Sequence, residues 1–141
     1  MNLDPDPLSS QVRGLFGSLT HAGSAPADAA TRTVQGEAGG EARGTRVRFE
    51  LSLRDGRVVA ARYQAYGCPH TLAVCEWLAQ ELEAGRVALL GSPEDWLRRL
   101  GVPIVKLGRL LVVEDALRAV LSVGGISAAL GRAAGVENVV K

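Results

Sequence analysis

The chain has few aromatic residues, few cysteines and no excess of charge of either sign. Its 141 residues include two Trp, two Tyr, two Phe and two Cys, with 16 basic residues against 15 acidic ones. Without basic runs interleaved with aromatics, the chain lacks the pattern of a nucleic-acid or membrane surface. No apolar stretch approaches the roughly 20 residues that span a bilayer, and the first residues lack a signal-peptide pattern. We therefore expect a cytoplasmic protein that binds neither nucleic acid nor membrane.

The two cysteines, Cys68 and Cys75, lie in a segment with helical hydrophobic spacing. On one helix their Cα atoms would be about 10 Å apart, which exceeds the roughly 7 Å limit for a disulfide. Two free thiols agree with a reducing compartment. The chain also contains no catalytic Ser/His/Asp arrangement, phosphate-binding Gly loop or zinc-spaced Cys/His set, so we do not expect an enzyme.

Hydrophobic periodicity places strands in the first half of the chain and helices in the second. Alternation over residues 46–66, broken by Asp55-Gly56, predicts a β-hairpin. Thr31 to Gln35 favours a third strand, separated from the hairpin by a flexible stretch, Gly36 to Gly40. Helices are predicted over 8–19, after Cys68 as far as Gly85, from Ser92 to about Gly101, over 110–123, and over 126–134.

This order predicts an α+β fold in which helices cover a small three-stranded antiparallel β-sheet. The length allows one hydrophobic core. We therefore expect a single domain over residues 1–125, followed by a helical C-terminal extension over 126–141.

The junction between the hairpin and the next helix is the most informative part of the sequence. A strand runs through Tyr66-Gly67 into a helix that begins at Cys68-Pro69. Pro69 suits the first helical position, where a backbone N–H is not needed. Unpaired amides and the helix dipole favour the thiolate form of a cysteine at this place. Cys68 is therefore the leading candidate for chemistry.

Three segments follow one another in the order of a known family. They are Asp55 to Cys68, Val105-Lys106-Leu107, and Val113 to Ala119. Over about Leu8 to Val123, this order resembles the U-type iron-sulfur scaffold proteins IscU, SufU and the N-terminal domain of NifU. The resemblance implies an IscU/NifU-like fold and the building of nascent clusters from iron and from sulfur supplied by a cysteine desulfurase, often with help from an Hsp70-type chaperone.

The sequence departs from the ligand set of that family. The family uses three cysteines, an aspartate after the first and often a histidine before the third, whereas this chain keeps the middle cysteine, Cys68. In place of the first Cys-Gly-Asp stands Arg43-Gly44-Thr45 or, in a shifted register, Gly39-Gly40-Glu41. In place of His-Cys stands Gly108-Arg109. If Arg43 and Arg109 occupy the vacated positions, two positive charges face Cys68, which lowers its pKa and repels iron.

The chaperone motif of the family, Leu-Pro-Pro-Val-Lys, is matched only in part by Val102 to Lys106. The partial match does not favour recognition by the Hsp70-type chaperone.

Other candidate residues have simpler interpretations. His70 and Glu41 are weak metal-ligand candidates, since His70 is better read as a surface or first-turn residue and Glu41 as a solvated carboxylate. Cys75 is expected in the core, because free cysteine behaves as a small hydrophobe. His21 is expected on the surface of a loop. Glu114 and Asp115 are expected to support the start of a helix.

Three hypotheses remain open. In the first, the chain is an IscU-like protein that meets a cysteine desulfurase or another assembly protein, with Cys68 as persulfide acceptor or surviving iron-sulfur ligand. In the second, it is a protein-interaction module without metal chemistry. In the third, a homodimer holds a cluster through Cys68 and His70 of both chains, because a [2Fe-2S] cluster needs about four ligands.

Overall fold

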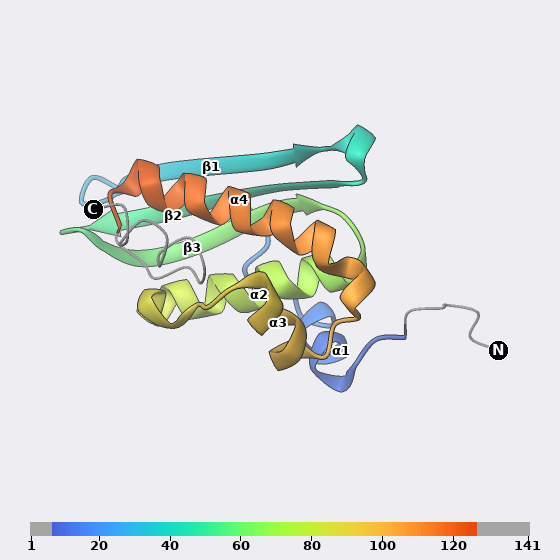
Figure 1. Cartoon of the computed structure of the whole chain (residues 1–141). Helices are drawn as coiled ribbons and strands as arrows, with labels where there is room; N and C mark the ends of the chain where they lie inside the picture. The colour runs from blue at the N-terminus through green and yellow to red at the C-terminus, as the bar shows by residue number, and fades with distance from the viewer. Residues whose placement is uncertain (1–6, 127–141) are drawn as a thin grey trace, which may run out of the picture.

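The computed structural model of the chain describes residues 7–126. It contains an antiparallel sheet covered by a layer of helices (Figure 1). The sheet has three strands in the order β1-β2-β3. The predicted α+β fold with a three-stranded antiparallel sheet is therefore confirmed. The elements are α1 (Ser10–Phe16), β1 (Arg32–Gly40), the 3₁₀ turn η1 (Glu41–Arg43), β2 (Thr45–Arg54), β3 (Arg57–Tyr66), α2 (Pro69–Glu83), η2 (Val87–Leu89), α3 (Pro93–Leu100), η3 (Ile104–Lys106) and α4 (Leu107–Gly124).

The β2–β3 hairpin turns at the two residues that the sequence indicated. Asp55 and Gly56 both have positive φ angles, 53° and 75°. Two consecutive left-handed residues form the turn whose twist matches that of the flanking strands. The register pairs Arg46 with Tyr66 and Arg54 with Arg57, with an irregularity at Ser52 and Leu53.

Strand β1 is longer than predicted, because the glycine-rich stretch from Gly36 to Gly40 belongs to it. All nine residues of β1 pair with β2. A Cβ atom on Gly36 would lie 2.2 Å from the backbone nitrogen of Val120 in α4. Glycine is needed there because the helix backbone lies against the strand backbone, and not because the chain must be flexible.

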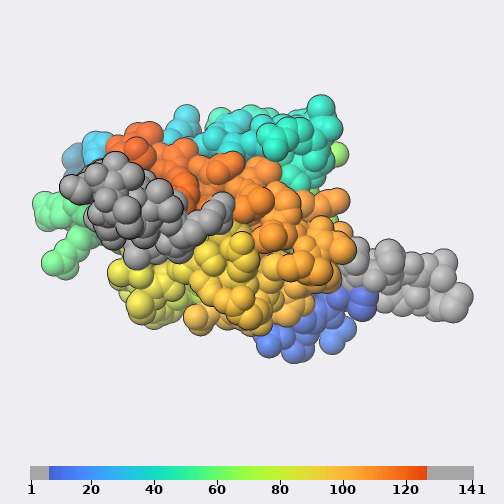
Figure 2. Space-filling view, viewed as in Figure 1, coloured from blue at the N-terminus to red at the C-terminus, as the bar shows by residue number. Residues whose placement is uncertain are grey.

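The helices cover one face of the sheet and enclose the core. Helix α4 packs on β1 and β2, α2 packs on β3, and α1 packs on α2. Figure 2 shows α4 seated between β1 and the segment around α3. The largest core side chains include Phe49, Leu51, Tyr63, Leu78, Trp96 and Leu117. The alternating residues of β2 thus supply the inner face of the sheet, as their period of two requires.

The helix ends follow their sequence signals. Ser92 and Asp95 form a capping box at the start of α3, and Gly101 ends that helix with a φ of 66°. Helix α4 begins at Leu107, so Glu114 lies in its interior and pairs with Arg118 at 3.2 Å. The expectation that Glu114 supports a helix start is therefore wrong.

The predicted C-terminal helix and extension lie outside the described residues, apart from Ile126. Between residues 7 and 126, no helix is both long and apolar enough to cross a membrane.

Replacing Gly36 with alanine should separate α4 from β1. The expected loss of unfolding free energy is at least about 2 kcal/mol, because a backbone nitrogen stands where the new methyl group would be. The matched control is Gly40→Ala in the same strand, where φ is −174° and nothing lies within 4 Å of the added Cβ. Urea denaturation should show a change within about 0.5 kcal/mol for that control. Equal effects of the two substitutions would contradict the close approach.

Candidate functional site

Cys68 occupies the N-cap position of α2, directly after β3. Its backbone is extended, with φ −83° and ψ 169°, and Pro69 follows in the first turn of the helix. The thiol is partly exposed. Its Sγ atom lies 3.5 Å from Oγ1 of Thr71. The cysteine therefore lies at a helix N-terminus, as predicted.

The surroundings of Cys68 favour its thiolate. Burial alone raises the pKa of the thiol, but hydrogen bonds from the Thr71 hydroxyl and from the backbone N–H groups of Thr71 and His70 lower it, and so does the charge of Arg109. The net result is a pKa below the ordinary cysteine value. Hydrogen bonds and a nearby cation act in this direction because both stabilise the negative form.

Three segments from separate parts of the chain lie at the same end of the sheet. Figure 1 places η1, the junction between β3 and α2, and the first turn of α4 at one end of the sheet. Arg109, in that first turn, is close enough for its charge to act on Cys68. Gly108 beside it has open space around its Cα. Arg43 lies in η1, and its charge is not among those that shift the thiol.

The other predicted candidates lie in different surroundings. His70 lies in the first turn of α2, as one of its two interpretations predicted, but it is buried, with 2% of its surface exposed, so the surface interpretation is wrong. Cys75 is fully buried in the core, as predicted, and burial raises its pKa. The Glu41 side chain is 70% exposed and lies 3.9 Å from Arg46. Among residues 7–126, no three His, Cys, Asp or Glu side chains form a group that could hold a metal ion.

The chain matches the model of one known protein family. The model described as NifU-like N terminal domain matches residues 9–122. The chain belongs to this family. No curated protein matches it significantly. Among solved structures, the crystal structure of a nitrogen-fixing NifU-like protein (N-terminal) from Brucella abortus has 14% sequence identity and a TM-score of 0.49, covering 81% of this chain and 94% of that chain. The general role of NifU-like domains is scaffolding in iron-sulfur cluster assembly.

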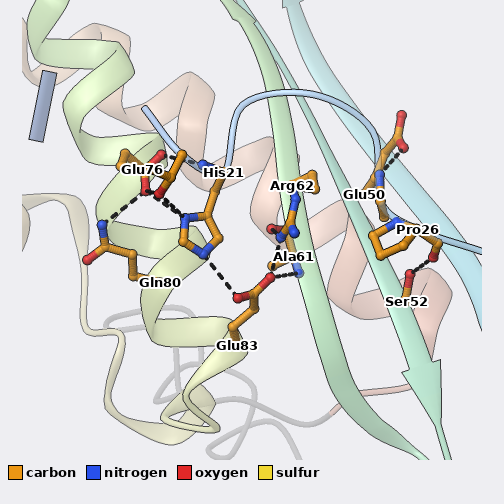
Figure 3. Close-up of polar contacts among 11 residues, drawn as sticks. His21, Pro26, Glu50, Ser52, Ala61, Arg62, Glu76, Gln80 and Glu83 are labelled. Carbon is orange, nitrogen blue, oxygen red and sulfur yellow. Dashed lines mark hydrogen bonds and ion pairs between the residues drawn. The ribbon is translucent and has the colours of Figure 1, made fainter. Parts of the chain in front are cut away.

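A second polar group in this NifU-like domain was missed by sequence reasoning. It is centred on Glu76, a residue of α2 whose side chain is fully buried. The carboxylate accepts a hydrogen bond from the backbone N–H of His21 at 3.0 Å and lies 2.7 Å from Nδ1 of His21 (Figure 3). It also accepts a hydrogen bond from the Tyr63 hydroxyl at 3.1 Å. Gln80 donates a further bond at 3.0 Å. Although burial raises the pKa of Glu76, these donors outweigh it and hold the pKa below its usual range.

His21 connects this carboxylate to a second one. Its Nε2 atom lies 3.0 Å from Glu83, which also accepts bonds from the backbone N–H of Ala61 and from Arg62 (Figure 3). The His21 side chain is 17% exposed. The expectation that His21 is a surface residue without a partner is therefore wrong. Only the spacing of Glu76 and Glu83 on one helix could have indicated the group, and no local signal links them to His21.

Removing the charge of Arg109 should reduce the reactivity of Cys68. We expect Arg109→Gln to raise the pKa of the thiol and to slow its alkylation by iodoacetamide several-fold near neutral pH, because less thiolate is present. The rate would be followed by peptide mass analysis over a range of pH. Arg86→Gln is the control, since Arg86 lies beyond the opposite end of α2 and bonds to Glu81. An unchanged pH profile for Arg109→Gln would contradict the electrostatic role.

Replacing Glu76 with glutamine should alter the response of stability to acid. A carboxyl with a lowered folded-state pKa stabilises the fold above its unfolded value of about 4.3 and loses that contribution as pH falls through the folded value. Glu76→Gln should therefore cost about 2 kcal/mol at neutral pH and lose less than the wild type on acidification. Chemical denaturation between about pH 3 and about pH 7 measures both effects.

The control for that experiment is Glu81→Gln on the same helix. Glu81 is half-buried and bonds to Arg86, whose side chain is exposed, so its loss should change stability by less than about 1 kcal/mol. If Glu76→Gln matched this control at neutral pH, the buried carboxylate would not have the stabilising role described.

Proposed function

We propose that this NifU-like domain carries sulfur on Cys68 during iron-sulfur cluster assembly, accepting it as a persulfide from a cysteine desulfurase. The observation that carries the proposal is a partly exposed thiol with a lowered pKa at the N-terminus of α2. A sulfur acceptor must be a nucleophile that a partner can reach. Cys68 meets both requirements, whereas Cys75 is fully buried and has a raised pKa.

The transfer would be a thiol–disulfide type of exchange without net oxidation. The Cys68 thiolate attacks the outer sulfur of the persulfide on the desulfurase, and a bond forms between Sγ of Cys68 and that sulfur. The sulfur–sulfur bond of the donor breaks, and the donor cysteine leaves as a thiolate. The proton of the donor persulfide stays on the transferred sulfur. In this role the chain is an acceptor and a carrier rather than an enzyme.

The positive charge near Cys68 favours a persulfide on this thiol over an iron-sulfur cluster bound by a single chain. A [2Fe-2S] cluster needs about four protein ligands, usually thiolates, and this chain has two cysteines, one of which is buried in the core. Arg109 lowers the pKa of Cys68 and would attract a persulfide anion in the same way. A cluster shared by two chains through His70 is less well supported, because that side chain is buried.

The test is a transfer experiment with the full chain, a cysteine desulfurase and free cysteine without oxygen. We expect the intact mass to rise by one sulfur atom, peptide mapping to place that atom on Cys68, and a reducing thiol to release it as sulfide. Cys68→Ser should abolish the gain. Cys75→Ala removes the other thiol and should keep the gain, which makes it the matched control.

Two outcomes would overturn the proposal. If the desulfurase turns over cysteine and Cys68 gains no sulfur, the thiol is not an acceptor. If added iron gives visible absorption and acid-labile sulfide that depend on Cys68, the thiol is a cluster ligand instead.

A further inference from the structure

We propose that His21, as a cation, is the central member of a clamp that holds α2 against β3 and thereby keeps Cys75 buried and the amides around Cys68 in place. The clamp follows from the contacts of the described residues alone. Its effect on a sulfur-carrying thiol rests on the proposed function.

The corner between β3 and α2 has Cys68 at its vertex and polar contacts across its two arms. β3 leads to Cys68 from one side, and α2 leaves from the other. Near the vertex, the Tyr63 hydroxyl of β3 donates to Glu76 of α2 at 3.1 Å. Farther out, the Ala61 N–H donates to Glu83 at 2.9 Å. The two carboxylates of one helix are thus joined to the strand that leads to the thiol.

The segment from His21 to Pro26 runs along the outer edge of β3 and then onto β2. The backbone of His21 and Gly23 bonds to that of Tyr63, at 3.1 Å and 2.8 Å. Ala25 N–H donates to Glu50 at 3.0 Å, and Ser52 donates to the Pro26 carbonyl (Figure 3). The segment, which we call the strap, therefore occupies hydrogen-bonding positions on β3 that β2 does not use.

The two carboxylate contacts of the His21 ring require the ring to be positively charged. Both ring nitrogens of His21 face carboxylate oxygens, at 2.7 Å from Glu76 and 3.0 Å from Glu83. A neutral imidazole donates from one nitrogen and presents a lone pair on the other, so only the protonated ring satisfies both carboxylates. When the ring loses a proton, one of the two contacts becomes a repulsion between a lone pair and an anion.

The groups around His21 keep both carboxylates of the clamp charged. α2 supplies Glu76 and Glu83, and β3 supplies Arg62 on Glu83 and the Tyr63 hydroxyl on Glu76. The pKa of each carboxyl is lowered, although burial opposes the shift, so both remain anionic into the acid range. The clamp should therefore be closed while the ring carries its proton and should loosen when the ring is neutral.

Opening of the clamp would affect both thiols, because Cys75 lies on α2 and Cys68 at its N-terminus. Cys68 is the N-cap of α2, and Cys75 is the buried neighbour of Glu76. When α2 separates from β3, Cys75 becomes accessible and the orientation of the amides around Cys68 is less well held. The rate at which Cys75 is alkylated therefore measures how often α2 separates from β3.

The test combines hydrogen exchange with thiol labelling on the full chain. Protection factors would be measured by NMR at about pH 6 and about pH 8.5, because histidine is the side-chain type that can change charge in this region. In the wild type, the amides of Gly23 and Ala61 should lose roughly tenfold in protection between these pH values, as expected for one charge-assisted hydrogen bond. Amides of the β1–β2 ladder serve as the internal reference and should keep theirs.

Two variants separate charge from structure. His21→Gln is neutral at both pH values and should show low protection and faster alkylation of Cys75 at both. His21→Arg is charged at both and should stay protected at both. Both variants keep His70, the second histidine of the chain, so any titration that His70 contributes is common to all three proteins.

The proposal is overturned if the wild-type protection of Gly23 and Ala61 does not depend on pH, a result that needs no variant. It is also overturned if His21→Gln retains wild-type protection at the lower pH. Neither readout involves persulfide transfer, so a failure of that transfer would leave the clamp intact, and a failure of the clamp would leave the transfer hypothesis intact.

Discussion

The buried carboxylate of Glu76 sets the strongest constraint on how this domain is put together. A charge without exposed surface needs donors on every side, because its desolvation is otherwise very costly. Those donors come from β3, from α2 itself and from the segment around His21. Satisfying one carboxylate therefore joins three parts of the chain and fixes the angle of the corner at which Cys68 lies.

The same corner determines the electrostatic surroundings of Cys68. At the end of β3, the extended backbone directs Cys68 into the free amides of the next helix, and Thr71 adds a hydroxyl. Arg109 then brings a positive charge from α4. These three influences stabilise a sulfur anion, and none of them attracts a cation such as iron, which only the thiolate itself would bind. In a family fold for cluster assembly, this charge pattern supports the proposal that Cys68 carries sulfur.

Local patterns predicted the elements well where the cause is local. The Asp55-Gly56 turn, the Ser92 capping box and the helix start at Pro69 depend on residues within a few positions of one another. The glycine-rich end of β1 was misread because Gly36 lies against Val120 and Gly39 against Val112, two residues far along the chain. Glu41 was considered as a ligand, but the structure places it beside Arg46 instead.

By itself, the sequence determined the order of strands and helices, the family resemblance and the place of Cys68 at a helix N-terminus. These follow from periodicity, turn residues and adjacent positions, which a linear chain displays directly. Only the tertiary structure decided that Arg109 acts on the thiol, that His70 is buried and that His21 bridges Glu76 and Glu83. Those relations depend on the packing of α4, α2 and the strap around one sheet, and charges that meet through packing have no regular spacing along the chain.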